Sequence, residues 1–219
     1  MEGNSGAQPM RIHRLANTLI NQIAAGEVVE RPASVVKELL ENALDAGADT
    51  IRIETSAGGM ESISVFDNGH GVPPREIPLI FTRFATSKVE SESDLESISS
   101  LGIRGAAKYS IASVSEVELE TSLSGSSVGS RIIIKNGDIV EQTDSPPIRG
   151  TRVKVLKLFG NFPARKKFLK SNVAESGRIH RLVQRYAMIR PDVSFELRQG
   201  QARPFATLCL LYTSDAADE

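Results

Sequence analysis

The chain has 219 residues, of which 40% are hydrophobic and 24% charged, as in a soluble globular protein, and these proportions exclude disorder of the whole chain. Its apolar runs are too short to cross a bilayer, and its first residues do not have the pattern of a signal peptide. A single cysteine cannot form an internal disulfide, and with only three histidines it makes a poor zinc site. Residues 1–150 hold 13 basic and 21 acidic residues, whereas residues 151–219 hold 13 basic and 6 acidic ones, so positive charge gathers in the last third. A phosphate-rich partner would suit that third, although a solvated basic helix face explains the charge equally well.

The N-terminal region predicts an arm followed by two helices. Residues 1–11 are rich in Gly, Ser and Asn, and we expect a flexible arm there, followed by a helix over residues 15–25. Pro32, which suits a first helical position, opens the second helix, and Gly47 stands where its C-terminal cap belongs. Apolar residues at helical spacing give this second helix a broad stripe, so one of its faces should be committed to the core.

The rest of the chain predicts a sheet with helices on one side. In chain order we expect a hairpin of strands over 50–55 and 62–66, a short helix over 76–81, a long Ser- and Glu-rich surface segment over 85–101, a helix over 106–112, strands over 117–121, 131–135 and 151–156, helices over 164–170 and 173–189, and a strand over 193–197. This order differs from the regular alternation of a doubly wound parallel sheet. The prediction is therefore an α+β fold, a two-layer sandwich with helices on one face of a mainly antiparallel mixed sheet.

Three polar residues of the second predicted helix share one face. Glu38, Asn42 and Asp45 are separated by four and three residues, offsets that return to nearly the same direction, opposite the apolar stripe. By itself such a face is most often solvated. A functional interpretation therefore depends on the motifs that follow.

The segment Asp67–Val72, with the sequence DNGHGV, comes directly after a predicted strand. Its glycines would also fit an ordinary strand-to-helix turn with positive φ, but such a turn does not require the aspartate. In a ligand site, glycines let the backbone approach a flat molecule, and Asp67 can accept a hydrogen bond from an exocyclic amine such as that of adenine. A third motif, Gly102–Ala107, precedes a predicted helix whose N-terminal N–H groups suit phosphate, although it matches neither the Walker nor the Rossmann pattern.

These motifs lie within longer strings by which the chain resembles the MutL family of DNA mismatch repair proteins. The most specific strings are NQIAAGEVV over 21–29, RPASVVKEL over 31–39 and ENALDAGA over 41–48, and the match extends over about residues 12–205. The N-terminal ATPase of that family belongs with the ATP domains of gyrase, heat-shock chaperones and histidine kinases. The resemblance therefore implies one ATPase domain of the GHKL type, with the Bergerat ATP-binding fold, over residues 12–205.

The resemblance also implies ATP and Mg²⁺ as cofactors and a role for each matching residue. Glu38 would be the general base that activates the water attacking the γ-phosphate, and Asn42 would ligate magnesium. Asp67 would accept a hydrogen bond from the adenine amine, with Thr151 supporting it. The other nucleotide-binding positions would be Asp45, Gly69 and Gly71, together with Thr86, Ser87, Lys88, Gly102, Arg104 and Gly105 in a lid.

The chain departs from the family pattern in several regions, among them residues 83–88 and 158–165, and two departures bear most on function. Residues 102–108 read GIRGAAK where the family usually has GFRGEAL, so a glutamate is lost and Lys108 is gained. A nucleotide sensor that does not hydrolyse ATP is therefore an alternative. Residues 206–219 continue no family pattern where a second domain would begin, and we expect a foreign tail there. A histidine kinase would share the adenine turn, but no phospho-acceptor helix pair precedes it here.

The basic residues of the last third predict a DNA-binding surface. Three of them recur at helical spacing on one face and three precede that helix: Arg178, Arg181 and Arg185, and Arg165, Lys166 and Lys167. Because aromatic residues are sparse nearby, contacts to the DNA backbone are favoured over reading of bases, and the family binds DNA without sequence preference. A solvated face and an ATP-independent DNA-binding module are the alternatives. The resemblance further implies an ATP-dependent dimer with itself or a MutL-type homologue, a mismatch-recognition partner of the MutS family, no membrane, and a place in the cytoplasm or nucleoid, or in the nucleus of a eukaryote.

Overall fold

The computed structural model describes residues 29–82 and 107–207. The strands are β1 Thr50–Ser56, β2 Ser62–Asp67, β3 Glu116–Ser122, β4 Gly129–Lys135, β5 Asp138–Ser145, β6 Gly150–Leu156, β7 Ser194–Gln199 and β8 Phe205–Ala206. The helices are α2 Pro32–Asp45, α3 Ile77–Ile80, α4 Ala107–Ser113, α5 Pro163–Lys166 and α6 Asn172–Ile189, with a single 3-10 turn, η1 Ala57–Gly59. The predicted arm, the predicted helix over 15–25, the lid over 86–105 and residues 208–219 lie outside the described residues.

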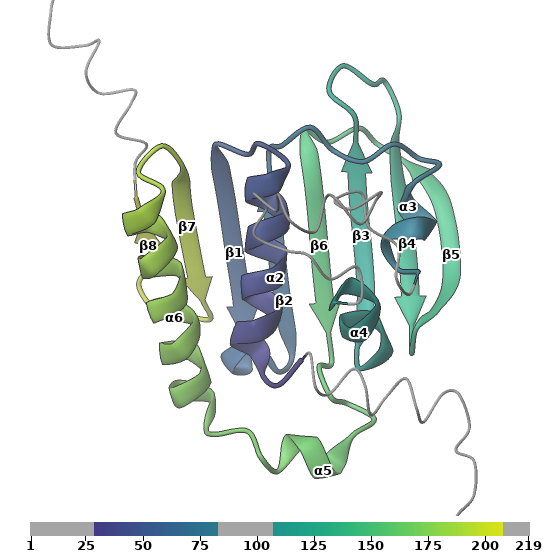
Figure 1. Cartoon of the computed structure of the whole chain (residues 1–219). Helices are drawn as coiled ribbons and strands as arrows, with labels where there is room; N and C mark the ends of the chain where they lie inside the picture. Colours follow the sequence, from purple (N-terminus) through teal and green to yellow (C-terminus); the bar gives the residue numbers. More distant parts are fainter. Residues whose placement is uncertain (1–28, 83–106, 208–219) are drawn as a thin grey trace, which may run out of the picture.

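The eight strands form one sheet with helices on one face (Figure 1). Their order is β5-β4-β3-β6-β2-β1-β7-β8. Neighbouring strands pair antiparallel, except that β1 and β7 run parallel. The predicted α+β sandwich with a mainly antiparallel mixed sheet is confirmed.

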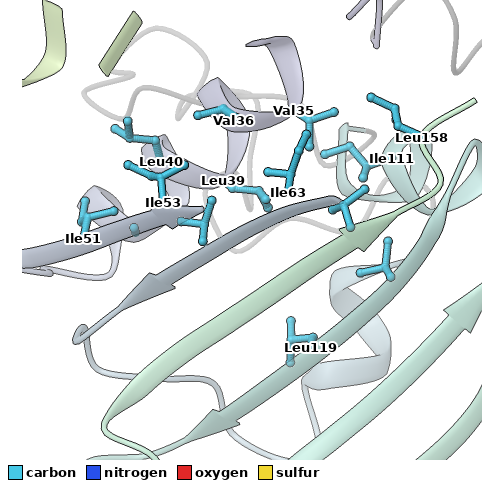
Figure 2. Close-up of a cluster of buried hydrophobic side chains, with 14 of the residues drawn as sticks. Val35, Val36, Leu39, Leu40, Ile51, Ile53, Ile63, Ile111, Leu119 and Leu158 are labelled. Carbon is cyan, nitrogen blue, oxygen red and sulfur yellow. The ribbon is translucent and has the colours of Figure 1, made fainter. Parts of the chain in front are cut away.

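Helix α2 lies over the middle of the sheet, beside α6 (Figure 1). Its buried stripe includes Val36 and Leu40, which are completely shielded from solvent. Figure 2 shows Leu40 next to Ile53 on the sheet. Each fully buried aliphatic side chain of this kind contributes roughly 1.5–3 kcal/mol to folding. Packing therefore directs the opposite, polar face of α2 away from the sheet.

The C-terminus of α2 is fixed by the glycine cap that the sequence predicts. Gly47 has a φ of +70°, its N–H donates to the carbonyl of Leu44 at 3.0 Å, and the Ala48 N–H donates to the carbonyl of Ala43 at 3.1 Å. These two bonds form a Schellman motif, which satisfies carbonyls at the end of the helix. The helix therefore ends at a defined residue, and β1 begins three residues after Gly47.

Besides the two-residue strand β8 and the turn η1, neither of which was predicted, two elements differ from the sequence prediction. Strand β5 was not expected, because its residues are exposed almost throughout and show no alternation; its pairing with β4 makes it an edge strand. The helix predicted over 164–170 is only the single turn α5, since Leu169 alone of its apolar side chains packs against the core and Phe168 is 87% exposed. Within the described residues, no helix has the length and apolar content needed to span a membrane.

Candidate functional site

A cavity of about 410 Å³ lies between the C-terminal half of α2, the segment after β2, α4 and the sheet. The predicted site residues that line it are Asn42, Asp45, Asp67, Gly71 and Thr151. Most of its remaining wall is apolar and comes from inward-facing strand residues and from α3 and α4, among them Val65, Ile80, Phe81, Ile111, Leu119 and Val153. Residues distant in sequence therefore meet in one largely apolar cavity that has a few polar groups.

Asp67 is the buried acid of this cavity. Its residue is 7% exposed, and burial raises the pKa of its carboxyl to about 6. The backbone N–H of Gly69 donates to Oδ1 at 2.9 Å, and this bond, together with the nearby backbone N–H of Thr151, opposes that rise in pKa. A carboxylate held in this way has a fixed direction and remains able to accept a further hydrogen bond from a ligand.

Thr121, which the sequence did not single out, fixes the wall beside Asp67. Its hydroxyl lies 3.0 Å from the hydroxyl of Thr151, accepts from the N–H of Val72 at 3.0 Å and donates to the carbonyl of Gly150 at 3.2 Å. It thus joins β3, β6 and the segment after β2. An inward-facing threonine on a predicted strand was the only sequence signal for this role.

Two glycines of the DNGHGV segment are required by close approach of the backbone. A Cβ atom on Gly69 would lie 2.6 Å from the carbonyl oxygen of Ala46, and one on Gly71 would lie 2.0 Å from the carbonyl oxygen of Ser122. Gly71 also has a φ of +75°, which side chains disfavour. Glycine at both positions therefore lets this segment lie directly against α2 and β3.

Glu38 and Asn42 are adjacent on the outer face of α2. The Asn42 side-chain amide Nδ2 donates to the backbone carbonyl of Glu38 at 2.7 Å and to Glu38 Oε1 at 3.3 Å. With Nδ2 engaged in this way, Asn42 Oδ1 is the end of the amide that can accept or coordinate. Asn42 lines the cavity, whereas Glu38 stands one turn before it, half-buried, and is not part of the cavity wall.

Other predicted site residues cannot be placed. Thr86, Ser87, Lys88, Gly102, Arg104 and Gly105 lie outside the described residues. Lys108, which the sequence marks as a departure from the family pattern, lines the cavity from the first turn of α4. His70 and Glu76 line it as well, and nothing in their spacing pointed to that place.

The six basic residues predicted to bind DNA fall into two groups. Arg165 and Arg178 are half-buried: the guanidinium of Arg165 lies over the ring of Phe159, and Nε of Arg178 is 3.8 Å from the buried carboxylate of Glu175. The four exposed ones are Lys166 and Lys167 on and after α5, and Arg181 and Arg185 on α6. The first two therefore have structural contacts, and the other four offer their charges to solvent.

Comparison with known sequences gives the chain its relatives. Residues 27–159 match the family described as histidine kinase-, DNA gyrase B-, and HSP90-like ATPase. The DNA mismatch repair protein MutL of Geobacillus thermodenitrificans is 50% identical over 197 residues, which are 90% of this chain and 30% of that protein. MutL of Symbiobacterium thermophilum is 49% identical over 197 residues, which are 90% of this chain and 31% of that protein. The chain thus spans about a third of the length of these curated relatives.

Solved structures agree with the sequence matches. The Aquifex aeolicus MutL ATPase domain complexed with ADP has a TM-score of 0.63 and 33% identity, over 78% of this chain and 61% of that one. The N-terminal domain of a DNA repair protein has a TM-score of 0.71 and 27% identity, over 86% of this chain and 55% of that one. The chain therefore belongs to the family of histidine kinase-, DNA gyrase B- and HSP90-like ATPases, and within that family it is a relative of the MutL mismatch repair proteins.

Proposed function

We propose that this chain binds ATP with Mg²⁺ in the cavity beside α2 and hydrolyses it, as the nucleotide switch of a MutL-type mismatch repair protein. The observation that carries the proposal is the meeting of Asn42 and Asp67, from two separate elements, in one cavity of about 410 Å³. That volume lies in the range of small-molecule sites, and a mostly apolar wall with a few polar groups is typical of them.

The base of the nucleotide would lie against Asp67. The apolar side chains of the wall suit the faces of a purine, and the buried carboxylate suits its amino group, because an ionised carboxylate only accepts hydrogen bonds. Asp67 is oriented by two backbone N–H groups, so it would recognise the amine without having to reorganise. Electrostatic attraction from the nearby His70 lowers the pKa of Asp67 and so favours the ionised carboxylate.

The phosphates would lie toward the polar face of α2. Asn42 has the donor chemistry for magnesium, since its Oδ1 is a neutral oxygen ligand and phosphates and water can complete the octahedron. Mg²⁺ bound there would neutralise charge on the phosphates. Glu38, one turn away, would take a proton from a water molecule as the water oxygen attacks the γ-phosphorus. The bond from that phosphorus to the bridging oxygen would break, and ADP and inorganic phosphate would form.

Two alanine variants test this proposal. We expect Glu38→Ala to keep ATP affinity within about threefold and to lower kcat by at least about 100-fold, because only proton transfer is lost. We expect Asn42→Ala to lose the magnesium-dependent part of ATP affinity. Glu54→Ala, which removes an exposed acid from the face of the sheet that bears no helix, is the matched control. Calorimetric titration with an ATP analogue and phosphate release on the same samples are the measurements.

The outcomes separate the candidate functions. If Glu38→Ala hydrolyses ATP as fast as the parent, Glu38 is not the general base. Saturable, magnesium-dependent binding without phosphate release from the parent protein would favour the non-hydrolysing sensor. Failure of the parent to bind any adenine nucleotide would defeat both.

We further propose that the protein binds DNA through backbone contacts, on the surface formed by Lys166, Lys167, Arg181 and Arg185. Their exposure supports this proposal, because all four charges are accessible to phosphate. A mismatch repair role would add an ATP-dependent dimer with a second copy or a MutL-type homologue, a MutS-type partner, and a location with the DNA, in the cytoplasm, nucleoid or nucleus.

A further inference from the structure

Glu41 is a buried acid on α2 to which the proposed mechanism gives no task. It is 5% exposed and stands three residues after Glu38 and one before Asn42. One oxygen, Oε1, accepts a hydrogen bond from the hydroxyl of Tyr186 at 2.6 Å and pairs with Nζ of Lys37 at 2.7 Å. Burying a carboxylate is unfavourable unless it is paired and hydrogen-bonded, so this geometry indicates a selected contact.

Tyr186 brings the hydroxyl from a different element. It lies on α6, 145 residues away along the chain, and its ring packs against the hydrophobic core. Burial and the charge of Glu41 raise the pKa of Tyr186 well above its usual range, so the hydroxyl keeps its proton and acts as donor. Glu38 also contributes to that rise, which brings Tyr186 within electrostatic reach of the proposed base.

The contact between Tyr186 and Glu41 differs in kind from the apolar packing that holds α2 against the sheet. The stripe that includes Val36 and Leu40 packs against aliphatic side chains, and such packing has little directional preference. A short hydrogen bond to a carboxylate is directional and charge-assisted. It therefore fixes the rotation of α2 about its own axis, on which the direction of the polar face depends.

We propose that Tyr186 is a positioning residue for the ATPase site: through Glu41 it fixes the rotation of α2 and so aims Glu38 and Asn42 at the phosphates. The inference rests on the proposed function. The proposal makes α6, which carries the exposed Arg181 and Arg185 on its outer side, the element that supports α2, the helix bearing Glu38.

The test is Tyr186→Phe, which removes one oxygen and keeps the ring in the core. We expect kcat at saturating ATP to fall about tenfold, since small misplacement of a reacting group is costly. The gain in ATP affinity on adding magnesium should shrink, because Asn42 is misdirected too. Nucleotide affinity in EDTA should stay close to that of the parent, and the midpoint of thermal unfolding should fall by only a few degrees, because Lys37 still pairs with Glu41.

Two further variants distinguish positioning from packing. Tyr109→Phe makes the same change on α4, where the hydroxyl has no hydrogen bond to any residue that the structure describes. It should behave as the parent does. Glu41→Gln keeps an oxygen that accepts from Tyr186 and should retain most of kcat, whereas Glu41→Ala should resemble Tyr186→Phe.

Each result decides the inference. Unchanged kcat and an unchanged magnesium-dependent gain in Tyr186→Phe would overturn it. A fall in thermal midpoint with both readouts unchanged would show a packing role only, and would overturn it as well. If the parent binds ATP without hydrolysing it, the proposed hydrolysis fails, and the magnesium-dependent gain in affinity alone then decides whether Tyr186 positions Asn42.

Discussion

At the scale of single residues, the cost of burying Asp67 should be visible in stability. Its carboxyl has a pKa of about 6 in the folded protein, against 3.8 as the ordinary value. Between these values the folded state holds more protons than the unfolded state, so this group's contribution to stability is complete below about pH 3.8 and is lost as pH rises through 6. The carboxylate is kept despite that cost, as expected where charge serves a ligand.

The prediction compares Asp67→Asn with the parent at several pH values. The free energy of unfolding of Asp67→Asn relative to the parent should rise by up to about 3 kcal/mol between pH 4 and pH 7.5, because asparagine does not titrate. Urea unfolding of the nucleotide-free proteins measures it. Any constant effect of the amide cancels in the comparison, so an equal difference at both pH values would contradict the burial of a charged Asp67.

A second residue-scale prediction concerns Gly71. Alanine there would place Cβ 2.0 Å from a backbone oxygen of Ser122 at a φ of +75°, and we expect a loss of at least about 3 kcal/mol. Gly125 is the matched control, since its φ is +80° and nothing lies within 4 Å of an added Cβ. Gly125→Ala should lose only about 1–2 kcal/mol, the cost of the backbone conformation. Equal losses in chemical denaturation would show that close approach to Ser122 has no importance.

At the scale of elements, we propose different tasks for the two sides of α6. Its inner side carries Tyr186, and its outer side carries Arg181 and Arg185. We expect Arg181→Glu and Arg185→Glu each to weaken DNA binding about tenfold at 0.1 M salt and to lower the slope of log affinity against log salt by about 1 or more. Lys135→Glu, on β4, reverses an exposed charge far from α6 along the sheet and should change little. Fluorescence anisotropy with a duplex measures both quantities.

The loss of DNA affinity in Arg181→Glu and Arg185→Glu should be the same for duplexes of different sequence, because the proposed contacts are to the DNA backbone. Arg178→Glu is a different case, because it would add a second negative charge beside the buried Glu175. We expect that variant to lower the free energy of unfolding in addition to any effect on DNA binding. If Arg181→Glu and Arg185→Glu leave both affinity and salt slope unchanged, the outer side of α6 is a solvated face.

The elements that the sequence predicted well are those with a local signal. The stripe of α2, its proline and its glycine cap all lie within sixteen residues, 32–47, and each has a physical meaning there. Strand β5 has no such signal, since its exposed residues do not alternate and only β4 makes it a strand. The segment 164–170 shows the opposite case, in which helix-forming residues with one core-packed apolar side chain, Leu169, give a single turn.

The candidate site divides in the same way. Asp67 and the glycines after it were predictable because a carboxylate in a glycine turn has a chemical use, and the face of α2 was predictable from its spacing. Thr121 and Tyr186 were not, because their partners come from distant strands or helices. Their roles depend on the order of strands in the sheet, which no short window of sequence contains.

At the scale of the whole molecule, β1 pairs with β2 directly after it in the chain, and with β7, whose Ser194 faces Thr50 in register. The ribosome therefore delivers the hairpin and α2 long before it delivers the strand that flanks them. Until β7 has been made, the edge of β1 that pairs with it is open. Synthesis therefore leaves the sheet unfinished beside β1 until about residue 199, and a nascent chain shorter than this lacks the parallel neighbour of β1.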